Sequence, residues 1–152
     1  MKNFKELSYK DINNAVKSAA FRIALIQKFI RFSTVSSLPV TGLIFEELVH
    51  LAFADIGICS GWSATNTSHK SGANVCGLSL KSNIIDGVKC QQTAITSYRT
   101  ASFNTLEEKL NFIEKEDEKH NGYLFAARNR KKYPHYFIYY FPKDLKPAFL
   151  NV

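Results

Sequence analysis

Residues 78–85, which read LSLKSNII, constrain the fold of this 152-residue chain more than any other stretch. Apolar and polar side chains alternate at its start, a pattern typical of a strand with one buried face. Asp86-Gly87 follows directly, and this dipeptide favours a two-residue β-hairpin. Residues 88–96 are then expected to return as an antiparallel strand. The chain is therefore predicted to contain a sheet in which residues 78–85 form a paired strand.

Two helices are predicted before this stretch and one after it. Ser8 is a good cap for a helix over residues 9–32, which has Asp11 in its first turn. The side chains expected on its buried stripe are Ile12, Val16, Ala19, Ala20, Ile23, Ile26 and Ile30. A second helix is expected from about Pro39 to Asp55. A third begins after Thr105, where Glu108 completes a capping box.

Further short strands are expected at residues 56–64, 73–76, 123–127 and 136–141, with a bulge at Gly77. The order of elements is helix, helix, a cluster of strands, helix and two strands. This order predicts an α+β or three-layer α/β domain spanning residues 1–152, with a mixed central sheet of about five strands flanked by helices.

The charge of the chain favours a polyanionic partner. Its formal net charge is +7 and its pI is near 9.3, and between residues 56 and 106 the only acidic side chain is Asp86. Nucleic acid and an acidic membrane surface both fit such a balance, and a basic excess that serves only solubility is the alternative. No apolar run reaches the roughly 18 residues of a membrane span, and nucleic acid, not a membrane, is the partner expected.

The three cysteines share no metal-ligand spacing, and free buried thiols in the cytoplasm are the simplest interpretation. The four histidines, at positions 50, 69, 120 and 135, likewise form no recognisable ligand pattern and are interpreted as surface or core residues.

One set of polar residues in the central stretch carries a chemical pattern. Asn74, Ser79 and Lys81 stand in the spacing N-x-x-x-x-S-x-K. With acids at the first two positions, the pattern would be the metal-site motif of the PD-(D/E)XK nucleases. The chain thus resembles this restriction-endonuclease-like superfamily, and its spacing is similar to that of MutH-like nicking enzymes and type II restriction endonucleases. Glu46, on the helix before the sheet, resembles the glutamate that many of these nucleases carry there.

The resemblance implies a magnesium-dependent endonuclease that hydrolyses phosphodiester bonds of double-stranded DNA. By resemblance, Asn74 and Glu46 would contribute to Mg²⁺ binding, Ser79 stands at the second acidic position, and Lys81 would orient water or offset charge on the phosphate. Asn74 and Ser79 are neutral, which departs from the motif. Asn74 is interpreted as an aspartate changed to an inactive form, and a homodimer or higher homo-oligomer is a further expectation.

Cationic and aromatic side chains beyond the motif are candidates for nucleic-acid contacts. Lys89 and Arg99 are expected to contact phosphates, and Tyr98 either stacks on a base or packs inside the protein. The loop 128–132, RNRKK, adds four charges: Arg128, Arg130, Lys131 and Lys132. Two alternatives remain open beside the nuclease. One is a catalytically inactive, basic nucleic-acid-binding module of the same fold, and the other is an interaction protein that joins a partner through residues 136–141.

Overall fold

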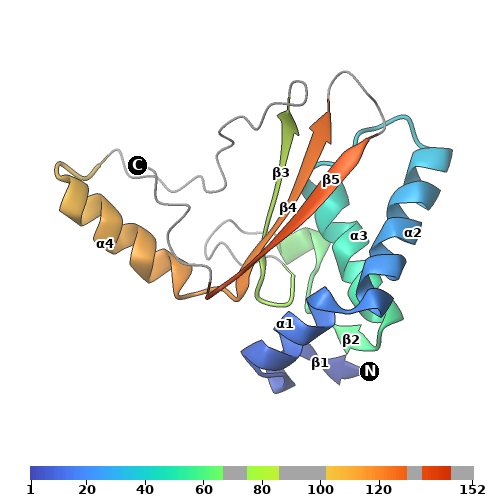
Figure 1. The fold of residues 1–152 in the computed structure, drawn as a ribbon, viewed down its shortest axis with the longest axis horizontal. Coiled ribbons are helices and arrows are strands. Elements are labelled where there is room, and N and C mark those ends of the chain that lie inside the picture. The colour runs from blue at the N-terminus through green and yellow to red at the C-terminus, as the bar shows by residue number, and fades with distance from the viewer. Residues whose placement is uncertain (67–74, 86–101, 130–134, 145–152) are drawn as a thin grey trace.

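The computed structural model describes residues 1–66, 75–85, 102–129 and 135–144, and within them the protein is an α+β structure (Figure 1). The elements in chain order are β1 (Lys2–Asn3), η1 (Phe4–Glu6), α1 (Tyr9–Lys17), α2 (Ala19–Val35), α3 (Gly42–Asp55), β2 (Ile58–Cys59), η2 (Ala64–Asn66), β3 (Ser79–Ile85), α4 (Leu106–Asp117), β4 (Gly122–Asn129) and β5 (Tyr136–Pro142). None of the helices in these ranges is long and apolar enough to cross a membrane.

The first predicted helix is in fact two helices, because Ser18 interrupts it. Ser8 and Asp11 form the expected capping box at the start of α1. Ser18 then leaves the helix with extended dihedral angles, φ −69° and ψ 149°. Its hydroxyl donates to the carbonyl of Ala15 at 2.7 Å and accepts from the backbone N–H of Phe21 at 3.1 Å. The serine therefore ends α1 and caps α2, an alternative to helical bonding that short polar side chains offer.

The buried stripe predicted for this region does not continue into α2. Ile23, Ile26 and Ile30 were expected in the core, but they are 55%, 49% and 63% exposed. Ala19 and Ala20 are exposed too. The residues that α2 buries are Phe21, Ala24, Leu25 and Phe29. Ile12 and Val16 lie on a common face of α1. Because the helix is interrupted at Ser18 and a new helix begins at Ala19, this helical spacing does not continue into α2.

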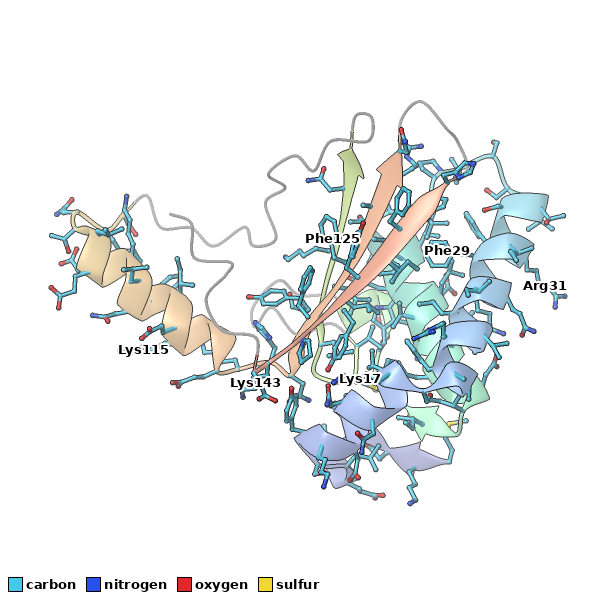
Figure 2. The ribbon with its side chains drawn as sticks, in the orientation of Figure 1. Lys17, Phe29, Arg31, Lys115, Phe125 and Lys143 are labelled. Carbon is cyan, nitrogen blue, oxygen red and sulfur yellow. The ribbon has the colours of Figure 1, made fainter. Side chains whose placement is uncertain are left out.

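Helix α3 packs against α2 and supplies five buried side chains to the core, those of Phe45, Leu48, Val49, Ala52 and Phe53. Phe45, Phe53 and Val49 are each at most 1% exposed. The ring centres of Phe21 and Phe53 are 4.6 Å apart, and those of Phe29 and Tyr136 on β5 are 5.2 Å apart in an edge-to-face arrangement. These aromatic contacts join α2 to α3 and to the sheet, and Figure 2 shows Phe29 between α2 and β5.

The main sheet has the order β3-β4-β5. β3 runs parallel to β4, and β4 is antiparallel to β5. A parallel neighbour requires a crossover connection, and the stretch between β3 and β4 contains α4. At the start of α4 the predicted capping box is confirmed, since Glu108 N–H donates to Thr105 Oγ1 and Thr105 N–H donates to Glu108 Oε2, both at 3.2 Å.

The prediction of a central sheet of about five strands is wrong for the described part of the chain. β1 and β2 form a separate two-stranded parallel sheet, and the strand expected at residues 56–64 is reduced to Ile58–Cys59. Its extension is stopped by Gly57, with φ 85°, and by Ser60, whose hydroxyl accepts from the Trp62 N–H at 3.3 Å. The return strand predicted at residues 88–96, like the Asp86-Gly87 turn, lies outside the described residues.

A tight turn stands where a bulge was predicted. Val75 and Leu78 form an antiparallel bridge, and the two residues between them both have positive φ, 51° at Cys76 and 72° at Gly77. This is the backbone signature of a two-residue hairpin turn. Asn121 holds the turn from the side, because its N–H donates to the Gly77 carbonyl at 2.7 Å and its amide to the Cys76 carbonyl at 3.3 Å.

Candidate nucleic-acid interface

Strand β3 sends its alternate side chains to opposite faces of the main sheet. Leu80 is buried in the core that α2 and α3 form. Ser82 lies on the same face, because its hydroxyl accepts from the Gly42 N–H at the start of α3, at 3.0 Å. Ser79 and Lys81 alternate with these residues and therefore lie on the other face. We call the two sides the helix face and the Lys81 face.

The pairing of β3 with β4 and β5 defines the rest of the Lys81 face. Across the sheet, Lys81 is in register with Phe125, which is in register with Tyr139. Ser79 is in register with Tyr123 in the same way. Figure 2 marks Phe125 on β4, in the middle of this sheet. The serine is 2% exposed, whereas the lysine is half-buried, so only the lysine of the two is open to a ligand.

Aromatic rings dominate the outer part of this face. Phe137 and Tyr139 on β5 are 45% and 47% exposed. The Tyr139 ring lies 6.5 Å from that of Phe125 and 6.3 Å from that of Phe141, nearly parallel to the latter. The sequences of β3, β4 and β5 contain no acidic residue. The Lys81 face therefore combines a cation with two accessible rings, those of Phe137 and Tyr139, while Phe125 between Lys81 and Tyr139 is only 4% exposed.

Glu46 lies on the other side of the sheet. It is on α3, whose neighbouring residues Phe45 and Val49 pack in the core of the helix face. Its carboxylate accepts a hydrogen bond from Trp62 Nε1 at 3.0 Å. The structure thus brings Ser79 and Lys81 together on one face and places Glu46 with the helices.

A polar cluster that the sequence did not reveal surrounds Glu46. Ser60 Oγ lies 2.6 Å from His50 Nδ1, and the rings of His50 and Trp62 are 5.4 Å apart. Glu46 and His50 are four residues apart on α3, a spacing that places them side by side. Because Ser60 is only 2% exposed, its hydroxyl is no nucleophile for a substrate. The cluster attaches residues 60–62 to α3.

Most of the remaining predicted contact residues lie outside the described residues. These are Asn74, Lys89, Tyr98, Arg99, Arg130, Lys131 and Lys132. Arg128 is at the end of β4, in register with Tyr136, and Tyr136 packs toward the core of the helix face. Arg128 is therefore on the helix face and half-buried, on the side of the sheet opposite Lys81.

The described residues do not fit a magnesium site. Within residues 1–66, 75–85, 102–129 and 135–144, no three His, Cys, Asp or Glu side chains come together as a set that could hold a metal ion. Ser79 offers a neutral hydroxyl, and the only acid assigned to the site, Glu46, is on the other side of the sheet. Mg²⁺ binding commonly uses one or two carboxylates, so these residues do not supply the ligands that a metal-dependent step would need.

The two cysteines of the described region are free thiols. Cys59 is half-buried and Cys76 is buried. Burial, and to a smaller extent the nearby Cys59, raises the pKa of the Cys76 thiol to about 12. Since the thiolate is the reactive form, Cys76 is an inert core residue.

Comparison with known proteins adds no family to this description. No protein-family model, no curated protein and no solved structure matches the chain. The nuclease resemblance therefore rests on the spacing of Asn74, Ser79 and Lys81, and the case for nucleic-acid binding rests on the chemistry of the Lys81 face.

Proposed function

We propose that the protein binds nucleic acid, and that the Lys81 face of the sheet is the contact surface. The observation that carries this proposal is that the half-buried Lys81 lies on the same face of the sheet as the exposed rings of Phe137 and Tyr139. A half-buried lysine on a paired strand offers a positive charge for contact with a phosphate. Neighbouring strands without acids, in a chain of net charge +7, do not oppose the approach of a polyanion.

The test is fluorescence anisotropy with a labelled 20-nucleotide DNA, both single-stranded and as a duplex, at several salt concentrations. We expect affinity to fall steeply with salt, because bound phosphates release counterions. Lys81→Ala should weaken binding and reduce the slope of log K against log salt by about 0.7 to 0.9, the value of one phosphate contact.

Arg31→Ala is the matched control for Lys81→Ala. Arg31 is exposed on α2 and points away from the sheet in Figure 2, so this variant loses the same charge from a different surface. We expect it to bind nearly as the unchanged protein does. Equal losses in the two variants would show that only net charge matters, and an absence of binding to either DNA at low salt would refute the proposal.

A second candidate function is metal-dependent cleavage of double-stranded DNA. The observation in its favour is that Ser79 and Lys81 lie on one face of a paired strand, the arrangement that the S-x-K part of the motif requires. In addition, the turn at Cys76 and Gly77 brings Val75, the residue after Asn74, against the start of β3. Assembly into a homo-oligomer belongs to this proposal, as in the nucleases that the chain resembles.

The test of cleavage is Asn74→Asp, assayed with supercoiled plasmid and Mg²⁺. Cutting should appear in this variant, vanish with a chelator, and vanish again when Lys81→Ala is added. Glu46→Gln separates a structural role of the glutamate from a role in metal binding. The amide oxygen of the glutamine still accepts the hydrogen bond from Trp62 but carries no charge for a metal. A folded Asn74→Asp protein that leaves the plasmid intact would rule out the nuclease and leave the binding proposal standing.

A further inference from the structure

We infer that the Lys81 face takes unpaired nucleic acid, with bases stacked on the exposed rings of β5. This inference rests on the proposed function, since it names the form of nucleic acid that the same face would bind. Two observations lead to it: the exposure of Phe137 and Tyr139, and their place on the same face of the sheet as Lys81, with β4 between them.

The two rings project from alternate positions of one strand. Alternate residues of a strand are about 6.8 Å apart, so Phe137 and Tyr139 offer separate stacking surfaces to neighbouring bases. Their strand neighbours Tyr136, Ile138 and Tyr140 pack toward the core on the helix face. The Tyr140 hydroxyl is also fixed by donating to Asn13 at 2.8 Å. These contacts on the helix face fix the position of β5, so the rings of Phe137 and Tyr139 are in place without a ligand.

The position of the cation suits a strand that crosses the sheet. Lys81 and Tyr139 are separated by the single strand β4, whose intervening residue Phe125 is buried, and neighbouring strands lie about 4.8 Å apart. The distance between their backbones is therefore about 10 Å. A chain whose base stacks on Tyr139 can place a phosphate near Lys81, a combination of stacking rings and positive charge that proteins use for single strands.

Duplex DNA does not fit these features equally well. In a duplex, the flat faces of the bases are covered by their stacked neighbours, so a ring reaches them only where the stack is opened. The rings of Phe137 and Tyr139 stand on the surface of a sheet and not on a narrow element that enters a groove. Unpaired bases expose the flat surfaces that these rings can contact.

The experiment uses the full chain and labelled 20-nucleotide probes of one sequence: single-stranded DNA, the same sequence as RNA, and duplex DNA. We expect the single-stranded probes to bind more tightly than the duplex. Tyr139→Leu keeps an apolar side chain but removes the ring, and should weaken single-strand binding by about fivefold to 150-fold, the range for losing one stacked base. Tyr139→Phe keeps the ring and should bind as the unchanged protein does.

Ile30→Leu is the control for an apolar change on another surface, because Ile30 is exposed on α2. Circular dichroism and thermal melting establish that every variant is folded. A duplex that binds as tightly as the single strands, or a Tyr139→Leu variant of unchanged affinity, would overturn the inference while leaving nucleic-acid binding intact. If no probe binds at low salt, the proposed function itself fails. Tighter binding of both single strands than of the duplex supports the inference, and a difference between DNA and RNA would then identify the preferred one.

Discussion

The turn that leads into β3 allows a sharp test of how the motif strand is positioned. Gly77 has φ 72°, and a Cβ added there would lie 2.7 Å from Asn121 Nδ2. Gly57 has a similar φ of 85°, but a Cβ there would meet nothing within 4 Å. Gly57→Ala therefore carries the backbone strain alone, about 1–2 kcal/mol, whereas Gly77→Ala carries the same strain together with a clash.

The clash has a definite energetic consequence. Asn121 must move, and its amide then loses the hydrogen bond to the carbonyl of Cys76, a residue that is fully buried. A buried carbonyl left without a partner costs about 1–3 kcal/mol. We therefore expect Gly77→Ala to lower the free energy of unfolding by about 2–5 kcal/mol, compared with about 1–2 kcal/mol for Gly57→Ala.

Urea denaturation of the two variants gives these free energies, and a double-mutant cycle isolates the contact. In an Asn121→Ala background the clash is absent, so the cost of Gly77→Ala should fall to that of Gly57→Ala. An interaction energy near zero in this cycle, or equal costs for the two glycine variants in the unchanged background, would refute the reasoning.

Burial leads to three further predictions. In the native protein, Cys59 should react with a thiol reagent, while Cys76 should react only after unfolding; reaction of Cys76 at the same rate would contradict its burial. The raised pKa of the Cys76 thiol means that the unfolded chain loses this proton near pH 9.0 and the folded chain only near about 12. The free energy of unfolding should therefore decrease as pH rises through this window, and the decrease should be smaller in Cys76→Ala, as urea titrations at each pH would show. Phe29→Ala should cost about 3–5 kcal/mol by thermal or chemical unfolding, whereas Ile30→Ala should cost about 0.5 kcal/mol or less; similar costs would mean that Ile30 is not on an open face.

The parts of the fold that were predictable from the sequence are those that local chemistry determines. Ser8 with Asp11 and Thr105 with Glu108 are reciprocal caps, and each needs only four consecutive residues. Strands β3, β4 and β5 were likewise recognisable from their alternating or aromatic side chains, because successive side chains of a strand lie on opposite faces of the sheet. These elements formed as expected, within a residue or two at their ends.

The parts that were not predictable depend on competition between weak local signals or on distant partners. A serine inside a helix lowers its stability only slightly, so a continuous helix through Ser18 was compatible with the sequence. Nothing in the residues before position 18 indicates that Ser18 ends one helix and caps the next. Similarly, β2 pairs with Lys2–Asn3 and not with β3, and no pattern within a two-residue strand specifies its partner. Pairing between segments far apart in the sequence is a property of the whole chain.

The candidate site shows the same division. Strand alternation predicts that Ser79 and Lys81 share a face, and the structure has them so. Alternation does not predict which face of the sheet the helices cover. Because they cover the face opposite Lys81, Glu46 and Lys81 are on different sides of the sheet. This arrangement is determined by Leu80, which packs in the core, and by Ser82, which accepts a hydrogen bond from the start of α3.

The register of β3 therefore decides which side chains of this strand occupy the Lys81 face. A slip of one residue would turn Lys81 into the apolar core and Leu80 onto the opposite face. The two-residue turn at Cys76 and Gly77, held by Asn121 at the start of β4, opposes such a slip because it ties both strands at the same end. Variants that loosen this turn should then lose nucleic-acid binding together with stability, whereas Lys81→Ala should lose binding alone. Affinity for nucleic acid and free energy of unfolding should both be measured on each variant. The two measurements together would show whether binding depends on the register of the sheet or only on the charge of Lys81.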